Sequence, residues 1–159
     1  MKLSTKGRYA VTAMADIARQ EHERPVSLGE ISERQNISLA YLEQLFGKLR
    51  RAGLVASMRG PGGGYTLARE ASLIAVAEIM AAVDERLKAT QCDGAVGEGC
   101  THDGAQCLTH NLWERLSAHV HVFLQQTTLE DVIATEIQPC PAVPDFSALL
   151  REEESSAHG

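Results

Sequence analysis

Apolar residues recur every three or four positions in two stretches of the first third of the chain, residues 4–20 and residues 39–52. This is the period of an amphipathic helix, which buries one face and exposes the other. The residues expected to face the core are Tyr9, Ala10, Ala13, Met14, Ile17 and Ala18 in the first helix, and Leu39, Leu42, Leu45, Phe46 and Leu49 in the second. Gly53 directly follows the second stretch and is expected to end that helix.

A shorter helix is predicted between these two from its capping residues. Ser27 and Glu30 have the spacing of a capping box, in which each side chain bonds the backbone N–H of the other residue, so a helix is expected over residues 28–35. Asn36 suits a left-handed turn, and Ser38 suits the cap of the next helix. Two helices joined by a tight turn form a helix-turn-helix, whose second helix is the candidate recognition helix.

Two short apolar stretches separated by glycines follow the recognition helix. Residues 54–59 and 65–68 are expected to form strands, with residues 60–64 as the turn between them. A β-hairpin directly after a helix-turn-helix is the layout of a winged helix, with the wing at about residues 54–68. Arg59 stands at the expected tip of the wing, where an arginine can enter a minor groove.

The second half of the chain is predicted to hold three further helices. The first covers residues 72–83, and the second begins near His110 and runs for about four turns. A last short helix is expected from residue 129 to about residue 135, capped by Thr127 or Thr128. The apolar stripe expected on the long helix consists of Leu112, Trp113, Leu116, Val120, Phe123 and Leu124.

This stripe would stay exposed on a helix that stands outside a compact winged domain. A second copy of the chain is therefore expected to cover it, giving a two-fold dimer that binds a palindromic site. The alternative is that the stripe packs on its own domain. The expected fold is mainly α with a small β-wing. Its predicted units are a winged helix-turn-helix DNA-binding region over residues 1–84, a ligand-bearing loop over 85–111, a dimerisation helix and a short terminal helix over 112–137, and a disordered tail over 138–159.

The charge is divided unevenly along the chain. Residues 1–69 carry eleven Lys and Arg against six Asp and Glu, whereas residues 70–159 carry four against fifteen, so the net charge of −6 conceals a basic first half. Such a half is typical of nucleic-acid binding, although a merely solvated surface is the alternative. Glutamine, arginine and glutamate on a recognition helix suit adenine, guanine and cytosine respectively. The candidate DNA-binding residues are Lys6, Arg8, Ser38, Tyr41, Glu43, Gln44, Lys48, Arg51 and Arg59.

Metal-binding chemistry is concentrated in one glycine-rich stretch, residues 90–110. Cys92, Cys100, Cys107 and His110 follow one another with gaps of seven, six and two residues. Thiolates and imidazole bind zinc and iron–sulfur clusters, and glycine lets the backbone bend closely around a compact site. The stretch is therefore predicted to hold a metal or a cluster.

The identity of this group is left open by the spacing. A structural zinc site usually has closely spaced cysteine pairs, which are missing here, but spacing alone does not separate zinc from iron–sulfur. His102 lies in the same stretch and is an alternative to His110 as the fourth ligand. Cys140, in the Pro- and Glu-rich tail, is expected to be a free thiol without a function.

Other classes of protein are disfavoured by the composition. No apolar run approaches the ~20 residues that span a membrane, and no signal peptide is recognised, so a cytoplasmic protein without a membrane partner is expected. No paired carboxylate or activated nucleophile stands out, so an enzyme is not expected.

Several segments resemble the IscR family, the bacterial regulators of iron–sulfur cluster assembly. The resemblance covers residues 1–135 and is carried by KGRYAVTAM at 6–14, ISERQNISLAYLEQLF at 31–46, LVASMRGPGGGY at 54–65 and CLTHNLW at 107–113. It implies a homodimeric winged-helix transcription factor. It also implies a cluster-bound form that represses the cluster-assembly genes, an apo form that binds a second class of sites, and the assembly machinery as cluster donor.

The same resemblance implies a [2Fe–2S] cluster held by Cys92, Cys100, Cys107 and His110. It further implies base contacts from Tyr41, Glu43 and Gln44, a minor-groove contact from Arg59, and a role for Glu43 in separating the two classes of site. The sequence departs from the family at two points. The gaps of seven and six residues between cysteines exceed the family's five and five, and position 40 is Ala where the family has Ser. The alternative functions are a zinc- or thiol-based winged-helix regulator without a cluster, and a small cluster-carrier protein.

Overall fold

The structure is a computed structural model that describes residues 4–20, 24–85 and 105–135. The predicted ligands Cys92 and Cys100, the alternative ligand His102, the predicted disordered tail and Cys140 lie outside the described residues. The elements are α1 (Thr5–Gln20), α2 (Leu28–Gln35), α3 (Leu39–Arg51), β1 (Val55–Met58), β2 (Gly64–Leu67), the 3-10 turn η1 (Ala71–Leu73), α4 (Val76–Ala82), α5 (His110–Gln126) and α6 (Leu129–Ala134).

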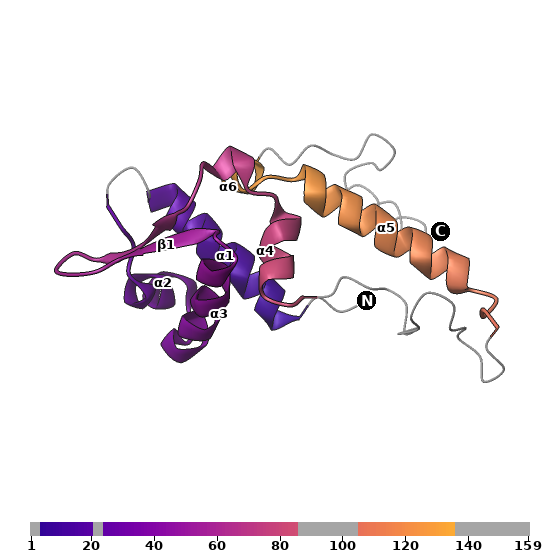
Figure 1. Cartoon of the computed structure of the whole chain (residues 1–159), viewed down its shortest axis with the longest axis horizontal. Coiled ribbons are helices and arrows are strands. Elements are labelled where there is room, and N and C mark those ends of the chain that lie inside the picture. Colours follow the sequence, from indigo (N-terminus) through magenta and orange to yellow (C-terminus); the bar gives the residue numbers. More distant parts are fainter. Residues whose placement is uncertain (1–3, 21–23, 86–104, 136–159) are drawn as a thin grey trace, which may run out of the picture.

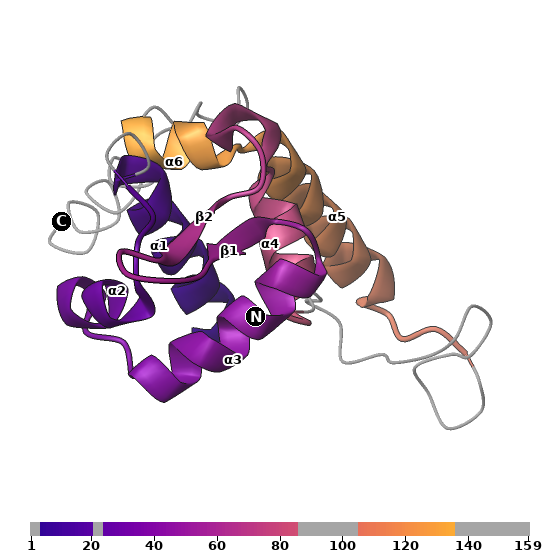
Figure 2. The ribbon, with the colours of Figure 1, turned by 60° about the vertical axis from the view of Figure 1, so that its left-hand side comes forward.

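The core surrounds α1, which contacts α2, α3, α4, α6 and β2 (Figure 2). The predicted apolar face of α1 is largely buried, with Met14 and Ile17 fully enclosed. Opposite it, α3 buries Leu42, Leu45, Phe46 and Leu49. Leu39, expected on this face, is instead 45% exposed, because it stands in the first turn of α3 beyond the edge of the core. The observed fold is the expected one, mainly α with a small two-stranded wing.

Local signals place the two helices of the helix-turn-helix as predicted. Ser27 and Glu30 form both bonds of the capping box of α2. Asn36 follows in the left-handed conformation with φ 52°, and the Ser38 side chain accepts a hydrogen bond from the Tyr41 N–H. The capping box begins α2, the left-handed Asn36 ends it, and Ser38 caps the start of α3, so α3 follows α2 after a tight turn.

The recognition helix ends in a glycine cap that leads directly into the wing. Gly53 has φ 71°, and the Leu54 N–H bonds the Leu49 carbonyl at 3.0 Å while the Gly53 N–H bonds the Arg50 carbonyl at 3.0 Å. This pair of bonds is the Schellman motif, and Leu54 and Leu49 are both buried, as that motif favours. The wing therefore starts at a position fixed by the end of α3.

The wing is an antiparallel hairpin in which Val55 pairs with Leu67 and Met58 pairs with Gly64. Gly64 was expected in the turn but belongs to β2. Its position beside Val26 explains the glycine, because an added Cβ would lie 2.5 Å from the Val26 carbonyl oxygen. Val26 and Tyr65 exchange backbone hydrogen bonds of 2.9 and 2.7 Å, which tie the wing to the residues that precede α2.

The helix expected over residues 72–83 is interrupted in the structure. A 3-10 turn comes first, Ile74 and Ala75 are extended, and α4 starts only at Val76. The interruption has a tertiary cause. The Leu129 N–H bonds the Ile74 carbonyl at 2.8 Å and the Val76 N–H bonds the Thr127 carbonyl at 2.9 Å. The backbone that would continue a helix thus forms a bridge to the junction of α5 and α6.

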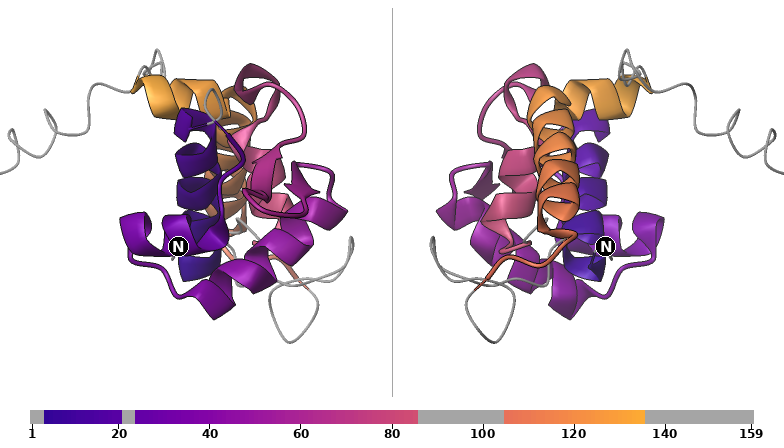
Figure 3. Two further views of the ribbon diagram at one scale, coloured as in Figure 1. Left: turned by 90° about the vertical axis from the view of Figure 1, so that its left-hand side faces the viewer. Right: turned by 90° about the vertical axis from the view of Figure 1, so that its right-hand side faces the viewer.

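The long helix α5 contacts α4 from its middle to its C-terminal end. Its C-terminal end lies beside α6, and its N-terminal end projects away from the bundle (Figure 1). The two views of Figure 3 show α5 from its two ends. α6 then begins with the predicted cap, since Thr128 and Asp131 form a capping box. None of the residues of α5 is buried.

Candidate nucleic-acid interface and metal ligands

One side of α3 presents polar side chains to solvent. Ser38, Glu43, Gln44 and Arg51 are exposed, as predicted for base and phosphate contacts. Arg50, not among the predicted contacts, is exposed as well. Because the opposite side of the helix is buried against α1, the polar side is held outward by the packing of the core.

Two of the predicted DNA-contacting side chains of α3 are half-buried and have partners within the protein. Tyr41 is half-buried, and its ring meets that of Tyr9 edge-to-face at 5.9 Å between centroids. Lys48 is half-buried and its ammonium lies 2.6 Å from the Asp84 carboxylate. The ammonium of Lys48 beside it lowers the pKa of Asp84, with Lys6 and Arg51 contributing at longer range. Sequence reasoning missed this ion pair, because Lys48 and Asp84 lie on separate elements.

The wing packs against α3 and carries the exposed Arg59 directly after its first strand. Phe46 of α3 and Tyr65 of β2 pack edge-to-face with 4.8 Å between ring centroids. Arg59 follows β1 directly and is exposed, as are Gly60 and Pro61 beside it. The polar side of α3 can contact one groove of a duplex, and the exposed arginine of the wing can contact another.

The start of α1 lies close to the start of α3. A cleft of about 360 Å³ between them is lined by Thr5, Tyr9, Asn36, Ile37, Ser38 and Tyr41. Arg8, on the first turns of α1, is exposed, whereas the Lys6 ammonium bonds the Asp84 carbonyl at 3.2 Å. The structure therefore brings Lys6 of α1 near Lys48 of α3, with Asp84 bonded to both.

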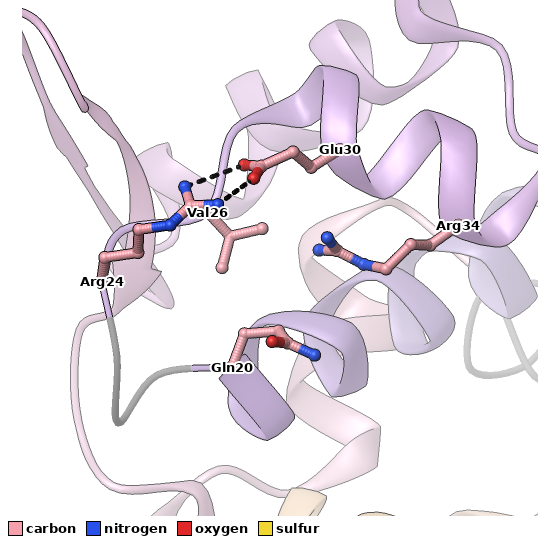
Figure 4. A pocket seen from close by; sticks show the side chains of 5 residues that line it. All are labelled: Gln20, Arg24, Val26, Glu30 and Arg34. Atoms are coloured by element: carbon pink, nitrogen blue, oxygen red, sulfur yellow. Dashed lines mark hydrogen bonds and ion pairs between the residues drawn. The ribbon is translucent and has the colours of Figure 1, made fainter.

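The position of α2 is held by two charged contacts. Asp16, buried on α1, accepts hydrogen bonds from the Arg34 guanidinium, the shortest at 2.6 Å, and from the Gln35 amide at 2.6 Å. At the other end of α2, Arg24 pairs with Glu30 (Figure 4). Hydrogen bonds from Arg24 and then from Ser27 lower the pKa of Glu30 to about 2. Both contacts fix the first helix of the helix-turn-helix to its neighbours.

Only two of the four predicted metal ligands fall within the described residues. Cys107 and His110 are both half-buried and are joined by one turn, in which the His110 N–H bonds the Cys107 carbonyl at 3.0 Å. Cys107 precedes α5, which begins at His110 as the sequence predicts. Its sulfur lies 3.8 Å from the Thr109 hydroxyl. The described residues contain no group of three His, Cys, Asp or Glu side chains placed to hold a metal.

The outer side of α5 is apolar and exposed. Its large exposed apolar residues are Leu112, Trp113, Leu116, Val122 and Phe123. Val120 and Leu124, also predicted in the stripe, are half-buried. The helix faces α4 through the smaller side chains of Ser117 and Ala118, across a cleft of about 340 Å³ that also touches His121. Most of the predicted stripe is therefore exposed in the single chain, with Val120 and Leu124 partly covered.

No helix in the described ranges is long and apolar enough to cross a membrane.

Comparisons with known proteins agree with this geometry. Residues 3–135 match the model of the Rrf2 family, described as an iron-dependent transcriptional regulator. The chain is 56% identical over 155 residues to the HTH-type transcriptional regulator IscR of Cereibacter sphaeroides. The aligned region covers 96% of this chain and all of that protein.

Solved structures of similar fold include two regulators. One is IscR of T. potens, with a TM-score of 0.67, 36% identity, and coverage of 93% of this chain and 96% of that one. The other is CymR, the global cysteine regulator of B. subtilis, with a TM-score of 0.72, 36% identity, and coverage of 85% and 98%. These similarities extend over the winged domain and α5.

Proposed function

This chain belongs to the Rrf2 family of transcriptional regulators, and we propose that it is a dimeric member that senses an iron–sulfur cluster and binds a palindromic operator. The cluster-bound form represses the genes for cluster assembly, and the apo form binds a second class of sites. The cluster comes from the assembly machinery. The observation that carries this proposal is the ligand pattern of Cys92, Cys100, Cys107 and His110, of which Cys107 and His110 are joined by one turn at the head of α5.

The DNA-binding part rests on the outward side chains of α3 and the wing. Gln44 and Glu43 are exposed at the centre of α3, where they can reach base edges in a major groove. Arg59 is exposed beside the glycines of the wing, where it can enter a minor groove. Glu43 separates two classes of site, because a carboxylate accepts a hydrogen bond from the cytosine amine but repels the acceptor edge of guanine.

The chemistry of the described donors fits an iron–sulfur cluster. Cys107 offers a thiol and His110 an imidazole from half-buried positions joined by one turn, and both donor types ligate such clusters. Cys107 and His110, together with Cys92 and Cys100, would hold a [2Fe–2S] cluster, and an imidazole ligand would give that cluster a higher reduction potential than an all-thiolate cluster has. The turn itself positions Cys107 and His110 beside α5, which carries the proposed dimer surface.

A zinc- or thiol-based regulator is the second candidate, and one observation favours it. The fold is shared with CymR of B. subtilis, which is named a global cysteine regulator, so the fold by itself does not specify a cluster. A cluster-carrier function has no such support, since the relatives compared are transcriptional regulators.

The deciding experiment is metal and sulfide analysis with visible absorption on protein purified without oxygen. We expect broad visible bands and equal iron and sulfide, lost in Cys92→Ala and altered in His110→Ala. Cys140→Ala is the matched control, because Cys140 is a cysteine outside the predicted ligand set. His102→Ala decides which histidine is the ligand.

A colourless protein with stoichiometric zinc would replace the cluster sensor with the zinc-based regulator. Selection of duplexes from random sequence by the cluster-bound and apo forms then tests the two classes of site. Identical selected sequences would remove the proposed second class.

A further inference from the structure

Asp84 occupies a singular position at the end of α4. It follows the helix cap Val83 and has φ 57°, so the chain turns sharply there. Its carboxylate lies 2.6 Å from the Lys48 ammonium of the recognition helix. Its carbonyl oxygen accepts a hydrogen bond from the Lys6 ammonium of α1 at 3.2 Å. One residue thus engages two cations from two elements of the candidate DNA interface.

The next residue strengthens this attachment. Glu85 accepts a hydrogen bond from the Ser4 N–H at 3.1 Å and another from the Ser4 hydroxyl. Gly7, one turn further along α1, is buried against Met80 and Glu85, since an added Cβ would lie 2.8 and 2.9 Å from their side chains. The end of α4 is therefore held against the start of α1 and, through Lys48, against α3.

These contacts place a carboxylate against a lysine of the candidate DNA interface. A DNA-binding protein gains affinity from each lysine that neutralises a phosphate. Lys48 already has an anionic partner, so a phosphate that approaches Lys48 competes with Asp84 for its ammonium. The pair is accessible to such exchange, because the Asp84 side chain is 73% exposed and that of Lys48 is 32% exposed.

We propose that Asp84 is an internal competitor of the DNA phosphates, which lowers the affinity for DNA by pairing with Lys48. Asp84 also precedes Cys92 by eight residues in the sequence, and the proposal extends to a dependence of this competition on the ligand state of Cys92 and Cys100. The second statement rests on the proposed cluster-sensing function, whereas the first does not.

The test of the competition is Asp84→Asn, which removes the charge, keeps the shape and suits a left-handed backbone. The matched control is Glu78→Gln, which changes the net charge equally but affects a carboxylate paired with Arg69, outside the predicted interface. The probe is a fluorescent duplex selected from random sequence by the wild-type protein, and the Kd is measured by anisotropy over a range of salt concentrations.

We expect Asp84→Asn to bind about two- to five-fold more tightly than wild type at low salt, as for an exposed ion pair, and Glu78→Gln to bind like wild type. In a Lys48→Gln background the gain should vanish, because the two side chains act as a pair. Equal effects of Asp84→Asn and Glu78→Gln overturn the proposal, as does weaker binding by Asp84→Asn.

The link to the ligand state is tested with the same variants in cluster-bound and apo forms. We expect the ratio of the two Kd values to move towards one in Asp84→Asn. If a cluster forms but Asp84→Asn leaves this ratio unchanged, the dependence on ligand state is wrong and the proposed function still stands. A protein that holds no cluster overturns the proposed function, and the comparison of Asp84→Asn with Glu78→Gln still decides the competition.

Discussion

Trp113→Ala tests whether the exposed stripe of α5 is a dimer surface. Trp113 is 42% exposed on a helix that contains no buried residue. A tryptophan presents roughly 250 Å² in total, so about 100 Å² is left for a partner to cover. At about 25 cal/mol per Å², covering it contributes ~2.5 kcal/mol for each protomer. A two-fold dimer uses the residue twice, so the substitution is expected to cost ~5 kcal/mol and to raise the dimer Kd by roughly three and a half orders of magnitude.

The assay is sedimentation equilibrium of wild type and variant over a wide range of concentrations. Gln125→Ala is the control, because Gln125 is exposed on the same helix but outside the apolar stripe. We expect wild type and Gln125→Ala to remain dimeric where Trp113→Ala dissociates. The free energy of unfolding of the dissociated variant shows that the fold survives.

The reasoning is refuted if wild type is a monomer at tens of micromolar (a concentration at which an interface of ~8 kcal/mol would assemble). It is also refuted if Trp113→Ala and Gln125→Ala have the same dimer Kd. If Trp113→Ala instead destabilises a monomer, the stripe packs on its own domain.

Three further predictions concern the winged domain and are checked by urea unfolding. Gly47→Ala should raise the free energy of unfolding by about 1 kcal/mol, because Gly47 is in a helix interior with open space around an added Cβ. Gly53→Ala should lower the free energy of unfolding by ~1 kcal/mol, because Gly53 has equally open space but φ 71°. Asp16→Ala should cost about 2–3 kcal/mol, below the range for a fully buried pair because Arg34 is 36% exposed and can turn to water; a loss near zero in urea unfolding would contradict this. Glu30 has a depressed pKa, so its contribution is present above the unfolded value of 4.5 and is lost as pH falls towards about 2; Glu30→Gln should flatten the dependence of unfolding free energy on pH across that window.

The winged helix could be predicted because its boundaries are encoded by neighbouring residues. The capping box at Ser27 and Glu30, the left-handed Asn36 and the glycine cap at Gly53 each act within one or two turns of chain. Such signals depend little on the rest of the molecule, so they can be recognised in the sequence.

The features that were missed depend on contacts between distant segments. Ile74 has the spacing of a helical residue and is fully buried as expected, yet it is extended because its carbonyl bonds Leu129. The same holds for the site. The exposure of Gln44 and Arg59 followed from helix and hairpin patterns, whereas the pairing of Lys48 with Asp84 required the packing of α4 against α3.

The two ends of α4 are attached in different ways, which bears on how the proposed cluster site could influence DNA binding. The C-terminal end of α5 is anchored by the Thr127 carbonyl, which accepts the Val76 N–H, so this end cannot move without breaking the bridge that starts α4. The other end of α4 has no such bridge to α5 and is held instead by Asp84 and Glu85. Side-chain ion pairs at an exposed site are weaker than buried backbone bonds. In the proposed mechanism, a change that reaches Glu85 would therefore act on the contacts of Glu85 with Ser4 and of Asp84 with Lys48 before it acted on the bridge at Val76.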